Sequence, residues 1–114
     1  MDLELIREYC LSKPSVTEST PFDETTLVFK VINKMFCLLN PNPPFSINLK
    51  YLPEKAIELR EEYEEICPGF HMNKKHWNTV ELEGNLSWEL IKEMIDDSYK
   101  LVVDKTSKKD RKNL

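Results

Sequence analysis

The fold of this chain is decided by the stretch Thr25-Thr-Leu-Val-Phe-Lys-Val-Ile-Asn-Lys-Met-Phe-Cys-Leu-Leu39. Two runs rich in β-branched and aromatic residues, 25–31 and 35–39, flank a short turn at Ile32-Asn33-Lys34. Such runs favour extended strands, and a short connection between them favours a hairpin. Because the strands of a hairpin are antiparallel, this stretch predicts the beginning of an antiparallel sheet.

Two further segments predict strands of the same sheet. Residues 45–50 alternate between apolar and polar side chains, which is the period of a strand with one buried face. Residues 77–82 form a similar run that ends at a turn near Gly84. If these two strands pair, the side chains on the outward face of the sheet include Asn48, Lys50, Trp77 and Thr79.

Three segments with helical periodicity surround these strands. Asp2 can cap a helix over 3–12, Pro53 suits the first turn of a helix that continues to Ile66, and Ser87 can cap a helix at the end of the chain. Three amphipathic helices and a hairpin-connected sheet predict an α+β fold in which the helices cover one face of the sheet. The other face is then available for binding.

The composition indicates one globular domain over residues 1–114. The chain has 40% hydrophobic and 32% charged residues, and its formal net charge is −4. It has no apolar run near the ~20 residues of a membrane span and no secretory signal, so we expect a cytoplasmic protein. Residues 104–114 are polar, and we expect them to form a frayed tail. Three widely spaced cysteines, Cys10, Cys37 and Cys67, predict buried thiols rather than a disulfide framework.

The stretch His71-Met-Asn-Lys-Lys-His-Trp-Asn-Thr-Val80 gathers imidazoles, ammonium groups, carboxamides and an indole within a few residues. These side chains donate hydrogen bonds, which suits an anionic or carbonyl-rich partner. One interpretation is a binding patch in which the indole stacks on a base; the alternative is a solvated loop with a buried tryptophan. The candidate binding residues are Lys50, His71, Asn73, Lys74, Lys75, His76, Trp77 and Asn78.

Catalytic and metal-binding alternatives are poorly supported by this sequence. Cys67, His71 and His76 offer donors that zinc prefers, but their spacing matches no zinc ribbon or finger and a fourth ligand is not nearby. No nucleophile with a neighbouring base and no pair of acid–base carboxylates is evident. We therefore expect no metal, no cofactor and no enzymatic activity.

The chain resembles the MmcQ/YjbR family of small bacterial proteins over nearly its whole length. The segments that carry the resemblance are Glu8-Tyr-Cys-Leu-Ser-Lys-Pro14, Phe29-Lys-Val-Ile-Asn-Lys-Met-Phe36, Ile47-Asn-Leu-Lys50, Pro68-Gly-Phe-His-Met-Asn-Lys-Lys-His-Trp-Asn-Thr-Val80 and Asp97-Ser-Tyr-Lys-Leu-Val-Val103. The resemblance implies an α-β sandwich similar to frataxin (CyaY) and a DNA-binding role. Iron binding is not carried over, because the first helix has too few acids for an acidic ridge.

The resulting functional hypothesis is a monomeric, non-enzymatic protein that binds DNA weakly through the patch around 71–78. Weak binding is expected because few cations are clustered and the chain is acidic overall. The alternative is a module that binds a protein or a small anionic ligand at the same surface.

Overall fold

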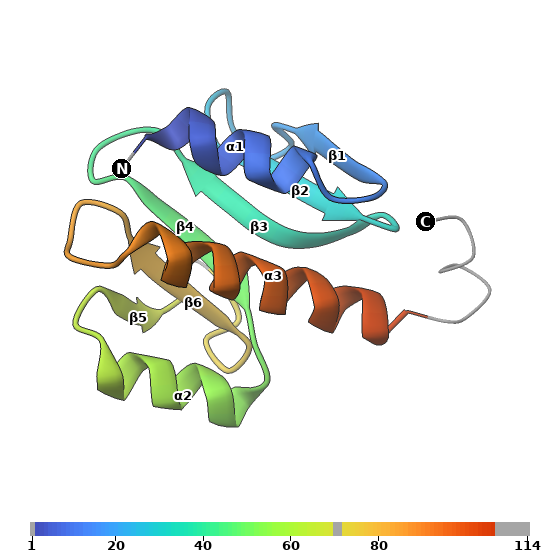
Figure 1. The fold of residues 1–114 in the computed structure, drawn as a ribbon. Helices are drawn as coiled ribbons and strands as arrows, with labels where there is room; N and C mark the ends of the chain where they lie inside the picture. The colour runs from blue at the N-terminus through green and yellow to red at the C-terminus, as the bar shows by residue number, and fades with distance from the viewer. Residues whose placement is uncertain (1, 70–71, 107–114) are drawn as a thin grey trace.

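A computed structural model describes residues 2–69 and 72–106 of the chain. Within these residues, six strands form one antiparallel sheet in the order β1-β2-β3-β4-β6-β5, accompanied by three helices (Figure 1). The elements are α1 (Leu3–Leu11), β1 (Val16–Ser19), β2 (Leu27–Val31), β3 (Lys34–Asn40), β4 (Ser46–Lys50), α2 (Pro53–Glu62), β5 (Ile66–Pro68), β6 (Trp77–Glu81) and α3 (Trp88–Asp104). The predicted α+β class is confirmed.

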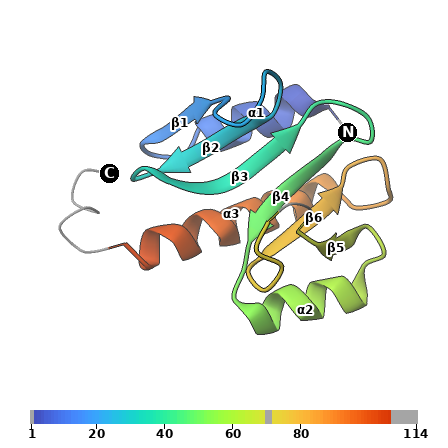
Figure 2. The same cartoon turned by 180° about the vertical axis from the view of Figure 1, so that it is seen from behind.

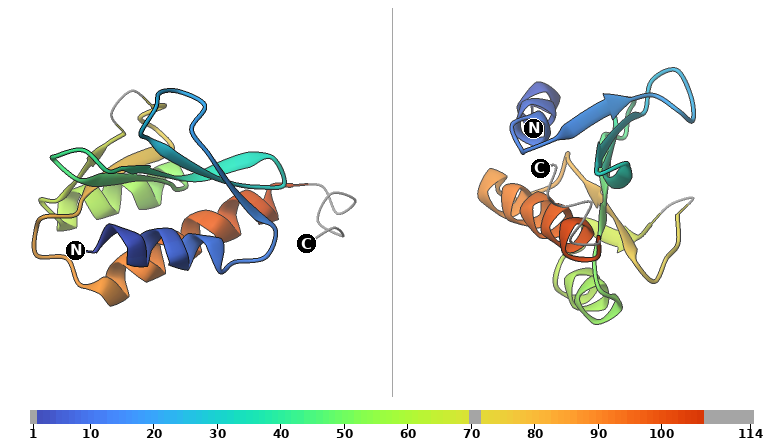
Figure 3. Two further views of the ribbon diagram at one scale, coloured as in Figure 1. Left: turned by 90° about the horizontal axis from the view of Figure 1, so that it is seen from above. Right: turned by 90° about the vertical axis from the view of Figure 1, so that its right-hand side faces the viewer.

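The helices cover one face of the sheet. In an edge-on view, α1 and α3 lie on the same side of the strands, and α2 lies beside the end formed by β5 and β6 (Figure 3). The view from behind shows the strands in front of α3 (Figure 2). The layer between helices and sheet is filled by the fully buried Ile6, Phe29, Phe36, Leu39, Ile47, Leu49, Val80, Ile91, Met94 and Ile95. The likeness to frataxin that the family resemblance implies stays a prediction.

The hairpin predicted from residues 25–39 is confirmed. Val31 pairs with Lys34, so the connection is a two-residue turn of Ile32 and Asn33. Their φ angles are 51° and 61°, and a turn with two positive φ values matches the twist of the strands it joins. The register shifts between Phe29 and Lys30, which leaves a bulge in this hairpin.

The second helix is shorter than its periodicity predicts. It ends at Glu62, where Tyr63 turns to an extended conformation with φ −124° and ψ 124°. Ile66, expected on the helix, instead begins β5 and pairs with Val80 of β6. Ile57, an apolar residue of this helix, is 50% exposed. The apolar residues of 63–66 suit a strand as well as a helix, and the unpaired edge of β6 decides between them.

Side-chain contacts join α1 to α3. The hydroxyl of Tyr9 donates to Asp96 Oδ1 at 2.6 Å, and the ammonium of Lys13 forms an ion pair with the same carboxylate. The Lys13 ammonium also lies 4.9 Å from the ring centroid of Tyr9 and 5.2 Å from that of Tyr99. Burial, together with the bond to Asp96, raises the pKa of Tyr9 to about 12. These contacts fix the helical layer on which the sheet rests.

The predicted helix caps are confirmed at both ends of the chain. Asp2 Oδ1 accepts from the backbone N–H of Glu4 at 2.9 Å, and Ser87 Oγ accepts from that of Leu90 at 3.1 Å. None of the helices in the described residues is long and apolar enough to cross a membrane. Most of the tail predicted to fray, residues 107–114, lies outside the described part of the chain.

Candidate functional site: a pocket on the open face of the sheet

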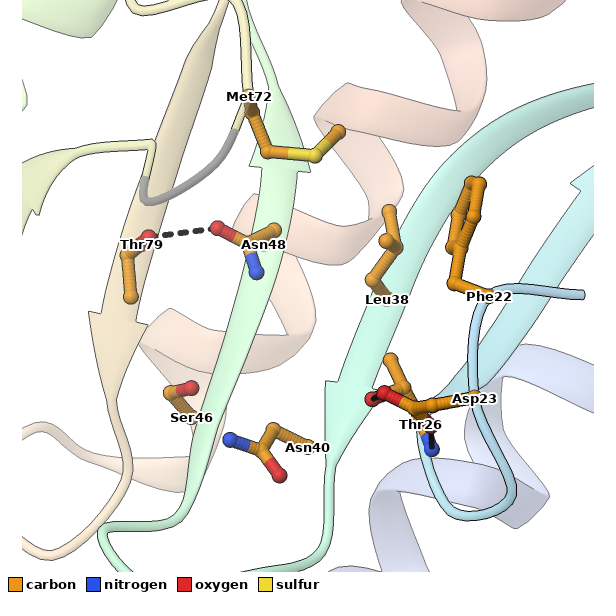
Figure 4. Close-up of a pocket in the computed structure, with 9 residues that line it drawn as sticks. All are labelled: Phe22, Asp23, Thr26, Leu38, Asn40, Ser46, Asn48, Met72 and Thr79. Carbon is orange, nitrogen blue, oxygen red and sulfur yellow. Dashed lines mark hydrogen bonds between the residues drawn. The ribbon is translucent and has the colours of Figure 1, made fainter. Parts of the chain in front are cut away.

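The uncovered face of the sheet carries a row of side chains that crosses three strands. Leu38 of β3 lies opposite Asn48 of β4, and Asn48 lies opposite Thr79 of β6. This row forms the floor of a pocket of about 390 Å³ (Figure 4). The lining residues are Phe22, Asp23, Thr26, Leu38, Asn40, Ser46, Asn48, Met72 and Thr79. A volume of this size suits a small organic molecule.

Hydrogen bonds fix the orientation of both carboxamides in the pocket. The hydroxyl of Thr79 donates to Asn48 Oδ1 at 2.5 Å, and the backbone N–H of Asn42 donates to Asn40 Oδ1 at 3.1 Å. Each amide oxygen therefore already accepts one hydrogen bond. The Nδ2 groups of Asn40 and Asn48 have no hydrogen-bond partner among the described residues, so both present N–H donors to the pocket.

The wall opposite these amides is formed by the loop between β1 and β2. Phe22 on this loop is 64% exposed and lies on the other side of Leu38 from Asn48 (Figure 4). Asp23 fixes the loop, because its Oδ1 accepts from the N–H of Thr25 at 2.9 Å and from that of Thr26 at 2.6 Å. Its Oδ2 accepts from the hydroxyl of Thr26 at 2.9 Å. These bonds, led by the Thr26 N–H, lower the pKa of Asp23.

The indole of Trp77 lies on the open face but is buried. Its side chain is 7% exposed and packs with Val28 and Leu38, with Met35 and Met72 at the edge of the cluster. The backbone of Gly69 passes so close that an added Cβ would lie 2.7 Å from Trp77 Cβ. The burial of Trp77 therefore favours the packing role that the sequence left open, and stacking on a base stays a prediction.

Asn78, a second predicted binding residue, is also buried, and its side chain points toward the helices. Asn78 Oδ1 accepts from Arg60 Nε at 2.6 Å, and Asn78 Nδ2 donates to the carbonyl of Ala56 at 3.1 Å. Arg60 also donates to the carbonyls of Lys74 and Trp77. Asn78 therefore joins α2 to β6 and is withdrawn from solvent, and its assignment as a binding residue stays a prediction.

The other predicted binding residues in the segment 71–78 differ in their exposure and in their hydrogen bonds. Asn73 Oδ1 accepts from the N–H of Lys75 at 2.9 Å, so Asn73 shapes the turn before β6. The ammonium of Lys74 donates to the carbonyl of Gly69 at 3.3 Å, whereas Lys75 is exposed. His76 is half-buried, and its buried Nδ1 has no hydrogen-bond partner among residues 2–69 and 72–106. His71 lies outside the described residues.

Lys50 lies at the end of β4 and pairs with Trp77 of β6, so the two residues share a face of the sheet as predicted. Its side chain is half-buried, and burial lowers the pKa of its ammonium. The neighbouring ammonium groups of Lys105 and Lys34 lower that pKa further. Lys34 of β3 and Lys105 at the end of α3 therefore each lie close enough to Lys50 of β4 to repel its ammonium, and sequence analysis did not identify these three lysines as a group.

Cys67 differs from the sequence prediction, because its thiol is exposed, while Cys10 and Cys37 are buried as expected. Burial of part of the side chain and the nearby Glu81 raise the pKa of Cys67, so the thiol is not activated as a nucleophile. The described residues contain no group of three or more His, Cys, Asp or Glu side chains that is arranged to hold a metal ion. His71, a candidate ligand, lies outside them.

Sequence reasoning placed Asn48 and Thr79 on the open face but missed the rest of the pocket. Asn40 and Ser46 could have been predicted to lie on the open face. Ser46 follows the alternation that places Asn48 outward, and Asn40 pairs with Ser46. The positions of Phe22 and Asp23 could not be predicted from a sequence pattern. The β1–β2 loop that carries them is held by its own hydrogen bonds and by the bond from Asn42 Nδ2 to Thr25 Oγ1 at 2.9 Å.

Comparison with known proteins agrees with the architecture described above. The YjbR family model matches residues 11–101. The chain belongs to the YjbR family. Protein YbdF of Escherichia coli O157:H7 is 39% identical over 113 residues, which cover 97% of this chain and 92% of that protein. Protein YjbR of Escherichia coli K12 is 33% identical over 116 residues, with 100% and 98% coverage, and both relatives are called uncharacterized.

Solved structures of YjbR-like proteins show the same fold. The crystal structure of Deinococcus radiodurans protein DR2400, described as a DUF419 domain, superposes with a TM-score of 0.90 at 40% identity and covers 96% of this chain and 85% of that one. A crystal structure of a Pseudomonas syringae protein has a TM-score of 0.76 at 30% identity, with coverage of 89% and 98%. The family resemblance inferred from the sequence is thereby confirmed.

Proposed function

We propose that this YjbR-family protein is a non-enzymatic binding module that takes a small organic ligand in the pocket on the open face of its sheet. The observation that carries the proposal is the combination of a pocket of about 390 Å³ with an aromatic wall and free amide donors. Ligand sites commonly pair apolar walls with a few placed polar groups. The burial of Trp77 and Asn78 leaves a nucleic-acid surface in this region without the indole for stacking and without one of its expected polar side chains.

The test is a titration with the fluorescent dye 1-anilinonaphthalene-8-sulfonate. We expect one saturable site, and we expect Phe22→Ser to weaken it about 10-fold, because an aromatic contact of this size contributes roughly 1.5 kcal/mol. The matched control is Ile57→Ser, which removes another exposed apolar side chain, 50% exposed on α2 and outside the pocket. Equal affinity of the two variants for the dye, or no saturable binding by wild type, would reject the pocket as a ligand site.

DNA binding is the second candidate, and the group of Lys34, Lys50 and Lys105 favours it. These cations, with the exposed Lys75, offer contacts to phosphate groups. These four cations of the described residues can make about four phosphate contacts, so they should contribute a slope of roughly −4 to the fall of log affinity for duplex DNA against log salt. Binding should be weak, since the chain has a net charge of −4.

Fluorescence titrations of labelled double- and single-stranded DNA at low and moderate salt test this candidate. The double variant Lys50→Ala, Lys75→Ala should lose most of the salt-sensitive binding. The double variant Lys55→Ala, Lys92→Ala removes the same charge from α2 and α3 and serves as control. If both variants lose the same amount of binding, only net charge matters and the lysine group is not a DNA site.

A further inference from the structure

We propose that the pocket selects a planar ring that carries a carbonyl or carboxylate oxygen. This inference rests on the proposed function, because it names the ligand class of the same pocket. Its basis is the distribution of donors, acceptors and apolar surface over the lining residues. The floor spans β3, β4 and β6, a distance of roughly two strand spacings or 10 Å, which accommodates a single ring with its substituent.

The polar side of the pocket offers hydrogen-bond donors. Asn48 Nδ2 and Asn40 Nδ2 are directed by the bonds that hold their oxygens, from Thr79 and Asn42 respectively. Ser46, whose backbone lies opposite Asn40, adds a hydroxyl to the same side (Figure 4). A ligand oxygen with two lone pairs satisfies such donors, whereas an ammonium group leaves them unpaired.

The carboxylate of the pocket is engaged by its own loop. Asp23 supplies the only carboxylate among the described lining residues; its Oδ1 accepts from the N–H groups of Thr25 and Thr26, and its Oδ2 accepts from the Thr26 hydroxyl. A cationic ligand would therefore have to share this carboxylate with the donors of the loop. None of the nine described lining residues is a lysine, arginine or histidine, which disfavours a multiply charged anion such as a phosphate ester.

The apolar side of the pocket suits a flat ring. Phe22 stands on one side of Leu38, and Met72 stands across the pocket from it (Figure 4). A phenyl ring and a thioether both make favourable contacts with aromatic groups, beyond the area they bury. A planar ring that lies over Leu38 reaches Phe22 with one edge and the donors of Asn48 with the other.

A fragment series measured by NMR titration of the ¹⁵N-labelled protein tests the ligand class. Benzamide should bind with a dissociation constant on the order of 1 mM and shift the side-chain N–H₂ signals of Asn40 and Asn48. Cyclohexanecarboxamide, which has the same amide on a puckered ring, should bind roughly 3-fold more weakly. Benzylamine, which replaces the acceptor by a cation, should bind at least about 10-fold more weakly.

The decisive variant is Asn48→Asp, which replaces the free donor by a charged acceptor of the same shape and keeps the bond from Thr79. We expect it to reverse the preference, so that benzylamine binds better than benzamide. Asn40→Asp serves as second variant where Asn48→Asp does not fold, and Asn85→Asp, on the exposed turn before α3, is the charge-matched control.

Each outcome of the series separates the two claims. Reversal in the pocket variant but not in the control supports the ligand class. Equal binding of benzamide and benzylamine to wild type, or an unchanged preference in the variant, overturns the ligand class while dye binding still supports the pocket. If neither fragments nor 1-anilinonaphthalene-8-sulfonate bind, the proposed function fails, and this inference fails with it.

Discussion

Replacing Trp77 with alanine should lower the free energy of unfolding by about 3–5 kcal/mol, the usual cost of truncating a buried aromatic side chain. The indole is 7% exposed and packs in one cluster with Val28 and Leu38 on the open face of the sheet. Its removal leaves a cavity that the surrounding backbone cannot close, because the strands beneath it are held in register. Urea denaturation followed by circular dichroism measures this loss.

Trp88→Ala is the matched control for this prediction. Trp88 is half-buried at the first residue of α3 and meets the ring of Tyr9 edge to face, with the centroids 5.7 Å apart. Its loss should be about 1–2 kcal/mol. If Trp77→Ala retains the stability of wild type but loses affinity for DNA, then Trp77 is an exposed stacking residue in solution and the packing role assigned to it is wrong.

Trp77 also shows which part of the site a sequence can specify. Alternation along 77–82 and pairing with 45–50 correctly place Trp77 on the open face beside Lys50. Whether that position is exposed depends on Met35 and Met72, and on the close passage of Gly69, which come from other parts of the chain. Burial on a nominally open face is therefore a property of tertiary packing, and periodicity does not contain it.

Tertiary packing also explains why the predicted end of α2 and the predicted burial of Cys67 were wrong. Ile66 follows Tyr63 at helical spacing, but a strand was available as an alternative, and β6 offered unpaired backbone groups that a longer helix would leave without partners. Cys67 then alternates to the exposed face of that strand. Local pattern predicts the hairpin of 27–40 and the capped helix ends well, because the residues that decide them are adjacent in sequence.

The floor of the pocket follows from local sequence pattern, and its wall follows from tertiary packing. Asn48 and Thr79 were predicted to share a face, and they form a hydrogen bond there. The loop that carries Phe22 is placed by the bonds of Asp23 and by the contact between Asn42 and Thr25, so its position over Leu38 follows only from the folded chain. The sequence therefore predicted the polar residues Asn48 and Thr79 of the floor, but it did not predict the wall formed by the loop that carries Phe22.

Replacing Ser98 with alanine should lower the free energy of unfolding by about 2–3 kcal/mol. Ser98 lies among the buried apolar residues of α3, and its hydroxyl contacts the sheet. Its Oγ accepts from the N–H of Lys50 at 2.9 Å and donates to the carbonyl of Phe36 at 2.6 Å. The first paired residues of β3 and β4 are Cys37 and Leu49, which adjoin Phe36 and Lys50 in the two strands.

The hydroxyl of Ser98 therefore replaces a backbone bond that the bulged β3 cannot make with β4. Alanine fits the space but leaves the Lys50 N–H and the Phe36 carbonyl without this partner, and each buried, unsatisfied group costs about 1–3 kcal/mol. Ser12→Ala is the matched control, since Ser12 Oγ donates to the carbonyl of Tyr9 at 2.6 Å on the exposed surface. It should cost less than about 0.5 kcal/mol. Urea denaturation and hydrogen exchange of the Lys50 amide measure both effects; an unchanged exchange rate in Ser98→Ala would show that the strands pair there without the serine.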